Sequence, residues 1–417
     1  MSECKACNAI VGQSGGPPAA INATLAGVIE AVLAGDEIET LYGAFNGIEG
    51  ILSDRFCDLT DLFRSKAGDL DLLSKTPAAA LGSCRVKLPD PHTESGDTYQ
   101  RIFSFFKKYN VRYFFYIGGN DSMDTVMKLS AASARYAPEM RFIGIPKTID
   151  NDLCGTDNTP GFGSAAKYIA STMTEIVRDC AVYTVKSVTL VEIMGRDAGW
   201  LTAAASLPSL VNGEGPDLAY FPEIPFDKER FFDDIENVMN DHPNVVIAVS
   251  EGLRYADGRY VGEGTQSSAL DIFGHKYLAG TAKALEFEVK NRFGCKVRSF
   301  DLCLPQRCAG HLMSETDRMM SIRTGNEAVE FALKGESACL ICCERHIDPQ
   351  GCLYFSYLPK DVREIANKVR TMPAEFINES KNGITEECAA YLLPLISGET
   401  ETKYENGLPK HYIINRN

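Results

Sequence analysis

The stretch YFFYIGGNDSMDTVMKL, residues 113–129, decides the fold. It opens as a continuous apolar run, turns at Gly118-Gly119 and continues with apolar residues at helical spacing. A strand that is apolar on both faces and leads through a tight turn into a helix is the repeating unit of a parallel α/β sheet. This stretch therefore predicts an α/β fold with mostly parallel sheets.

The same alternation recurs outside this stretch. Apolar runs predict strands at 8–13, 111–119, 141–147, 187–195, 244–252 and 297–305. Helical spacing predicts helices at 21–35, 97–109, 164–179 and 228–241. A chain of 417 residues is long for one core, so two Rossmann-like lobes are expected, with the Gly/Pro/Asn-rich segment 150–163 passing between them. After about residue 335 the signals weaken, and helix packing is the default expectation.

Composition excludes several classes of function. A net charge of −14 and a pI near 5.0 argue against nucleic-acid binding and against an anionic membrane surface. The chain starts without a signal-like apolar segment and contains no run of 18 apolar residues, which predicts a cytoplasmic protein. The 14 cysteines are then expected to be thiols, and the lone pair Cys4 and Cys7 favours inert thiols over a metal or redox site.

Several loops that follow predicted strands carry polar or glycine residues. Gly15 and Gly16 precede two prolines and a helix, a pattern that suits either phosphate binding or a tight turn between strand and helix. Asp150 and Asp152 stand two apart on an extended segment, so they suit one base and one metal contact, although turn-capping aspartates give the same pattern. Loops at the carboxyl ends of parallel strands meet at one edge, where open α/β folds bind ligands.

Five short motifs occur together in the order seen in phosphofructokinases. They are the SGG of 14–16, LGSCR of 81–85, GGNDS of 118–122, PKTIDND of 146–152 and MGR of 194–196. The chain resembles that family over roughly residues 8 to 330. The resemblance implies the phosphofructokinase fold, with a donor lobe formed by 1–160 and about 308–417, and a sugar lobe formed by 161–307.

The resemblance also implies the roles of individual residues. Asp150 would be the base that activates the 1-hydroxyl of fructose 6-phosphate, and Asp152 and Asn120 would lie at Mg²⁺. Donor contacts are implied for Gly15, Gly16, Arg85 and Lys147, and transfer is assisted by Asp121, Lys147 and Arg196. Sugar-phosphate contacts are implied for Thr148, Ile149, Asp150, Met194, Gly195, Arg196, Glu251, Arg298 and Arg307. One arginine of this pocket comes from a neighbouring subunit in the family, so a homodimer or homotetramer is implied.

Two positions favour pyrophosphate over ATP as the phosphoryl donor. ATP-dependent members of the family have glycine where this chain has Asp121, and glycine again where it has Lys147. An aspartate there would repel a nucleotide α-phosphate, whereas a lysine would attract a small, highly charged donor. We therefore expect reversible transfer from pyrophosphate; an ATP-dependent 6-phosphofructokinase and a catalytically silent regulatory subunit are the alternatives.

Three positions depart from the family pattern. Asn120 replaces an aspartate usually near Mg²⁺, which leaves direct coordination by Asn120 open. Ser187, with Lys186 beside it, stands where a cation from a neighbouring subunit is expected. Leu304 replaces a polar or aromatic residue that usually faces the sugar. The 6-phosphate pocket is therefore the part that the sequence defines least.

Overall fold

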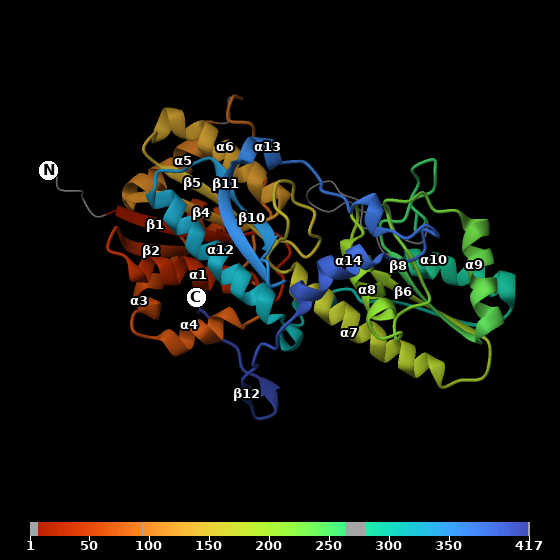
Figure 1. Ribbon diagram of the computed structural model, residues 1–417. Helices are drawn as coiled ribbons and strands as arrows, with labels where there is room; N and C mark the ends of the chain where they lie inside the picture. The colour runs from red at the N-terminus through yellow and green to blue at the C-terminus, as the bar shows by residue number, and fades with distance from the viewer. Residues whose placement is uncertain (1–6, 94–95, 264–279, 416–417) are drawn as a thin grey trace.

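Two β-sheets, each covered by helices on both faces, organise the chain into two lobes (Figure 1). The structure is a computed structural model that describes residues 7–93, 96–263 and 280–415. Cys4, for which an inert thiol was predicted, lies outside this range.

The first sheet has seven strands in the order β11-β10-β5-β4-β1-β2-β3. Its strands are β1 (Cys7–Gln13), β2 (Ile38–Ala44), β3 (Phe56–Asp58), β4 (Val111–Gly118), β5 (Arg141–Pro146), β10 (Cys339–Ile347) and β11 (Leu353–Asp361). The five central strands are parallel, and β3 and β11 add antiparallel edges. Antiparallel edges on a parallel sheet are common in α/β folds.

The second sheet is entirely parallel, in the order β7-β8-β6-β9. Its strands are β6 (Ser187–Ile193), β7 (Leu218–Tyr220), β8 (Asn244–Ser250) and β9 (Lys296–Asp301). A separate hairpin, β12 (Tyr404–Glu405) and β13 (Leu408–Pro409), lies near the end of the chain. Because β9 is an edge strand, one side of its backbone is unpaired within the described chain.

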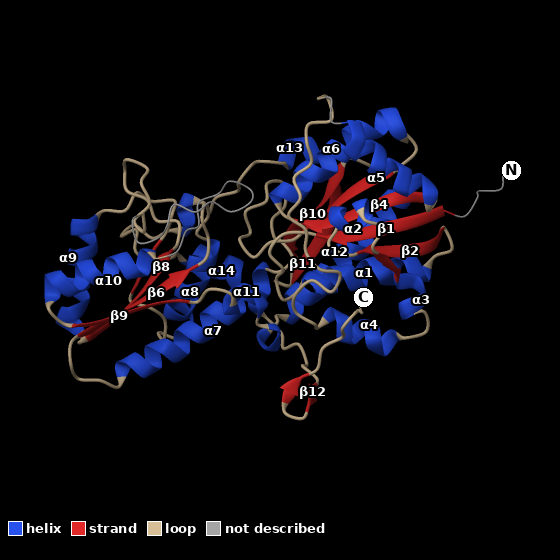
Figure 2. Cartoon of the chain, turned by 180° about the vertical axis from the view of Figure 1, so that it is seen from behind, coloured by secondary structure: helices blue, strands red, loops and turns tan. Residues whose placement is uncertain are grey.

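Helices cover both faces of each sheet (Figure 2). Those of the first lobe are α1 (Ile21–Ala34), α2 (Ile48–Leu52), α3 (Leu59–Phe63), α4 (Ala67–Ser74), α5 (Gly96–Lys108), α6 (Asn120–Tyr136), α12 (Glu315–Leu333) and α13 (Val362–Ile365). Those of the second lobe are α7 (Phe162–Ala181), α8 (Trp200–Val211), α9 (Lys228–Asp241), α10 (Thr281–Phe293) and α14 (Glu386–Leu392). The four-residue α11 (Pro305–Cys308) and the 3-10 turns Gly310–Leu312, Ala374–Phe376 and Leu393–Ile396 complete the set.

Alternation along the strands divides the core into layers. Ala9 and Val11 of β1 point into the layer that contains α1 and α12, whereas Ile10 points into the layer that contains α5 and α6. Both layers are apolar, so the strand carries no polar alternation and appears in the sequence as a continuous apolar run. The helices α1 and α12 approach closely because Gly27 has no side chain. A Cβ at this position would collide with the backbone carbonyl of Ile322.

All six predicted strands and all four predicted helices are present, with ends that differ by a few residues. The expectation of helix packing after residue 335 is wrong for its first part. There β10 extends the first sheet beside β5, and β11 returns antiparallel to it. The apolar run of β10 is short and is followed by the polar residues 344–346, so its sequence signal is weak.

Two further features of the described residues concern the state of the cysteines and the possibility of a membrane-spanning helix. The 13 described cysteines are all free thiols. Among these same residues, no helix combines the length and the apolar character that crossing a membrane requires.

Candidate active site

The loops that follow β1, β4, β5, β6 and β8 bring most of the predicted site residues together. The segment 147–161 links β5 of the first lobe to α7 of the second, so the site draws on both sheets. Lys147, Asp150, Asp152 and Arg307 influence one another electrostatically across this junction. Loops at the carboxyl ends of parallel strands thus form one polar site, as the fold rule predicts.

Two cations lie directly over the Gly15-Gly16 turn. The Lys147 Nζ is 2.8 Å from where a Cβ on Gly15 would lie, and an Arg307 guanidinium nitrogen is 2.6 Å from where one on Gly16 would lie. Gly15 also has φ of +79°, which disfavours any other residue. The glycines therefore let two positive side chains reach bare backbone, and this favours the anion-binding interpretation of the turn over a purely structural one.

Lys147 is nearly buried, with 4% of its surface exposed. Its backbone N–H donates to the Gly118 carbonyl at 3.1 Å, which fixes it beside the turn at the start of α6. Burial lowers the pKa of Lys147 to about 8, although the nearby Asp150 carboxylate opposes this effect. At pH 7 the side chain is still mostly a cation, held in a site of low dielectric where its charge acts strongly.

The Asp150 carboxyl is held by the residue two before it. The Thr148 hydroxyl donates to Asp150 Oδ2 at 3.2 Å, and the Asp150 N–H donates to the Thr148 hydroxyl oxygen at 3.1 Å. Burial raises the pKa of Asp150, against the hydrogen bond from Thr148 and the charge of Lys147. Burial and the Asp150 charge raise the pKa of Asp152 to about 7. A carboxylate whose pKa is raised toward neutrality is a better general base than a free one.

The sugar side of the site is built from the ends of β6 and β8. Glu251 Oε1 accepts from the Gly195 N–H at 3.1 Å, and the Gln306 side chain accepts from the Met194 N–H at 3.1 Å. Burial raises the pKa of Glu251 to about 8, with Asp150 adding to the rise and Arg196 opposing it. Gly195 adopts φ of +132°, which only glycine tolerates well.

Some buried polar atoms of the site have no hydrogen-bond partner among the described residues. They are Arg196 Nε, Arg307 Nε and Asn120 Oδ1. A buried polar atom without a partner in the protein is costly unless a ligand satisfies it. Two guanidinium donors suit phosphate oxygens, and a side-chain carbonyl suits a hard cation.

The donor set fits Mg²⁺ and no all-protein metal cage. Among the described residues, no cluster of three or more His, Cys, Asp or Glu side chains could hold a metal by itself. Mg²⁺ is usually bound by one or two carboxylates together with substrate phosphates and water. Asp152 supplies a carboxylate, and the unpaired Asn120 Oδ1 supplies a carbonyl.

Three predicted residues lie differently from the rest. Arg298 is on the edge strand β9, where its side chain is 43% exposed and 3.9 Å from Asp179. Arg85 is exposed, but its charge acts on Lys147 and Arg307. Ile149 is 5% exposed and packs into the core of the second lobe, so its side chain is structural.

The partly buried Asp121 lies in the first turn of α6, directly after the Gly118-Gly119 hinge.

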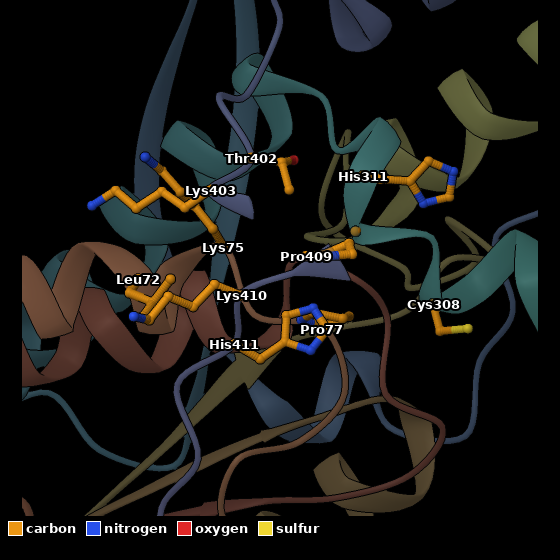
Figure 3. Close-up of a pocket in the computed structure, with 11 residues that line it drawn as sticks. Leu72, Lys75, Pro77, Cys308, His311, Thr402, Lys403, Pro409, Lys410 and His411 are labelled. Atoms are coloured by element: carbon orange, nitrogen blue, oxygen red, sulfur yellow. The ribbon is translucent and has the colours of Figure 1, made fainter. Parts of the chain in front are cut away.

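A cavity of about 110 Å³ is lined by Cys308 of α11 and by residues of α4 and the C-terminal hairpin (Figure 3). Lys75, Lys403 and Lys410 contribute positive charge to it. Their carboxylate neighbours largely neutralise that charge, since Lys75 and Lys403 both contact Asp71, and Lys410 lies 2.9 Å from Glu405. This cavity is therefore a weaker anion site than the Gly15-Gly16 turn.

The sequence interpretation missed three contributors to the site. Gln306 orients the Met194 backbone, and nothing in its local sequence marks it. Arg370 and Tyr391, from the C-terminal part of the chain, contact the Asp150–Asp152 loop. Their separation from the loop by more than 200 residues leaves no local signal.

Comparison with known proteins places these features in a family. A family model described as Phosphofructokinase matches residues 8–332. The pyrophosphate–fructose 6-phosphate 1-phosphotransferase of Halomonas elongata is 41% identical over 97% of this chain and 95% of its own length. The enzyme of that name from Methylococcus capsulatus is 40% identical over 98% of this chain and 96% of its own. The crystal structure of a pyrophosphate-dependent phosphofructokinase from Nitrosospira multiformis is 36% identical, with a TM-score of 0.85, and covers 97% of this chain and 95% of that one.

Proposed function

The chain belongs to the phosphofructokinase family, and from this we propose that it is a pyrophosphate-dependent enzyme acting on fructose 6-phosphate. It transfers a phosphoryl group reversibly from pyrophosphate to the 1-hydroxyl of fructose 6-phosphate, giving fructose 1,6-bisphosphate and phosphate. Four relatives that bear this name are 35–41% identical to the chain. Donor and product hold phosphoryl groups of comparable energy, which is why the transfer runs in both directions.

The observation that carries the donor site is the pair of cations over the Gly15-Gly16 turn. Lys147 and Arg307 both point at this turn, so a small anion with several charges meets two cations and bare backbone at once. Asp121, at the start of α6, adds a negative charge where a longer donor would continue. Pyrophosphate ends before that point, whereas a nucleotide would extend past it.

The chemistry is assigned to residues of the loop after β5 and their neighbours. Asp150 takes the proton of the sugar 1-hydroxyl as that oxygen bonds to the terminal phosphorus of pyrophosphate. The bond from this phosphorus to the bridging oxygen breaks, and phosphate leaves. Lys147 and Arg196 hold the negative charge that spreads over the transferring group. Asp152 and Asn120 would hold Mg²⁺, which neutralises phosphate charge when bound.

The sugar is held by the second lobe. Glu251 binds sugar hydroxyls, and Met194 and Gly195 line the sugar. Arg307, which the resemblance assigned to the sugar 6-phosphate, lies over Gly16 and is assigned here to the donor. Thr148 and Arg196 contact the sugar on the side of transfer. The division of work follows the lobes, with residues 1–160 and the part after about 308 binding the donor and 161–307 binding the sugar.

Arg298 reaches a sugar phosphate only in an oligomer. It lies on the exposed edge strand β9, away from the residues around Asp150. A second copy of the chain that docks against this edge would place Arg298 in its partner's site. A homodimer or homotetramer is therefore part of the proposal.

The test is the initial rate with fructose 6-phosphate and Mg²⁺, with pyrophosphate and ATP compared in parallel. Turnover with pyrophosphate and none with ATP is the expected result. Turnover with ATP alone would overturn the choice of donor. No turnover with either would favour a regulatory subunit that keeps the fold.

A further inference from the structure

The loop that carries Asp150 and Asp152 is tied down by the last part of the chain. We propose that Tyr391 and Arg370 are positioning residues, which fix the backbone of Asn151 so that the aspartates on either side point into the site. The inference rests on the proposed function for the roles of the two aspartates. The contacts themselves are independent of that function.

Asn151 has an unusual conformation that its neighbours must maintain. It is fully buried and has φ of +53°, in the left-handed region. Its side-chain oxygen accepts from the N–H and the hydroxyl of Thr159, at 3.1 and 3.3 Å. Its side-chain amide donates to the Tyr391 hydroxyl at 2.8 Å. Asn151 separates Asp150 from Asp152, so its backbone angles set the directions of both.

Tyr391 fastens both ends of the loop with one hydroxyl. It accepts from Asn151 and donates to the Asp157 carbonyl at 2.6 Å. The ring is held in turn by Trp200, with centroids 5.1 Å apart, and by Arg345, whose guanidinium lies 4.5 Å from the ring centroid. The hydroxyl therefore has a fixed position before the substrate binds.

Arg370 supports the same loop next to Tyr391. Its backbone N–H donates to the Asp152 carbonyl at 2.7 Å, and its guanidinium donates to the carbonyls of Asp157 at 2.8 Å and Asn151 at 3.4 Å. The guanidinium lies 4.4 Å from the Trp200 ring centroid, and the Trp200 indole donates to the Arg370 carbonyl at 3.3 Å. Both the charge and the backbone of Arg370 are thus used on the loop.

The path of the chain explains why this support matters to a site between lobes. After β11 the chain leaves the first lobe, crosses to the second and returns through α14 (Figure 1). On the way, α14 packs with Trp200 of α8 in the core of the second lobe. A loop that starts from β5 of the first sheet is therefore fastened to the second. This holds Asp150 in place relative to Arg196 and Glu251, which follow strands β6 and β8 of that second sheet.

The test compares two tyrosines that each lose only a hydroxyl. Tyr391→Phe removes the bonds to Asn151 and Asp157. Tyr99→Phe is the matched control, because Tyr99 of α5 is 2% exposed and its hydroxyl donates to the Pro89 carbonyl at 2.6 Å, not to a residue assigned to the site. We expect Tyr391→Phe to lower kcat at least about 10-fold, since small misplacements of reacting groups cost up to about 100-fold. KM for both substrates should change less than about twofold, because Lys147, Gly195 and Glu251 keep their contacts.

A merely structural role would affect both variants alike. If Tyr391→Phe turned over at the rate of Tyr99→Phe, or if both lost activity in proportion to their fall in Tm, the inference would be wrong. Hydrogen exchange of residues 151–159 gives a second readout that needs no turnover. Faster exchange there in Tyr391→Phe alone supports the inference, and unchanged exchange overturns it. A wild-type protein that is silent with pyrophosphate would defeat the proposed function, while the exchange experiment would still decide the positioning role.

Discussion

Replacing Lys147 by methionine tests the donor site most directly. Methionine keeps much of the aliphatic length of lysine but removes the charge. In the native protein this charge lies 2.8 Å from the position that a Cβ on Gly15 would occupy. The side chain is 4% exposed, so its charge acts in a medium from which water is largely excluded. Loss of one preorganised donor to a transferring group typically lowers kcat about 100- to 1000-fold. We expect a loss of about that size with pyrophosphate, and a change of less than about threefold in KM for fructose 6-phosphate.

The pH dependence gives this prediction a second, independent signature. Burial lowers the pKa of Lys147 to about 8, so the group is charged below that pH and loses its proton as the pH rises through it. The value of kcat/KM for pyrophosphate reports the free enzyme. The value of kcat/KM should fall about tenfold between pH 7 and pH 9, because at a pH one unit above its pKa a group is only about one-tenth protonated. Lys147→Met has no such proton to lose and should lack this alkaline limb.

The assay is initial rate by coupled detection of fructose 1,6-bisphosphate, from pH 6 to pH 9.5. Lys167→Met is the matched control, because Lys167 is also buried, with 7% exposed, but pairs with Glu399 away from the site. Equal rates for the two variants would refute the assignment of Lys147 to the donor. Persistence of the alkaline limb in Lys147→Met would refute the origin of that limb.

Three further predictions follow from the same geometry. Asp150→Asn should lower kcat about 100- to 10,000-fold by removing the base, while calorimetry still detects fructose 6-phosphate binding; near-normal turnover would exclude Asp150 as the base. Asp121→Gly should weaken turnover with pyrophosphate and make ATP a competitive inhibitor; if neither donor responds, Asp121 does not select the donor. Burial raises the pKa of Glu192 to about 7. Between pH 5 and pH 7 the folded state therefore holds a proton that the unfolded state has already lost near pH 4.5, so Tm should fall as pH rises across this range. Glu192→Gln should flatten that slope, and an unchanged slope would contradict its origin.

The layers of the fold could be predicted from the sequence because burial on both faces leaves a plain signal. Strands such as β4 and β8 are continuously apolar, and each lies in the middle of its sheet. The edge elements are different. β11 is only partly buried along its length, so its sequence is mixed and gives no clear period. Its place in the sheet is set by pairing with β10, which is a tertiary fact.

The candidate site likewise contains residues that a local motif predicts and residues that only the tertiary structure brings in. Lys147, Asp150 and Asp152 occur in one short motif, so their proximity follows from the chain itself. The side chains that aim this motif come from elsewhere. Asn151 and Tyr391 are separated by 240 residues, and neither belongs to a pattern that would pair them. Arg298 shows a further limit, because it lies on an exposed edge strand and the role proposed for it depends on a second copy of the chain.

In the proposed function, donor selection works by attraction and by exclusion together. Lys147 attracts any polyphosphate, so by itself it would favour ATP and pyrophosphate alike. Asp121 supplies the difference, since two like charges about 4 Å apart near a protein surface repel by about 4 kcal/mol. That repulsion acts only on a donor long enough to reach the start of α6. Removing Asp121 alone should therefore admit ATP as a ligand without making it a good donor, because removing a charge adds no contact to adenosine. An efficient change of donor requires both the removal of this charge and new contacts beyond it.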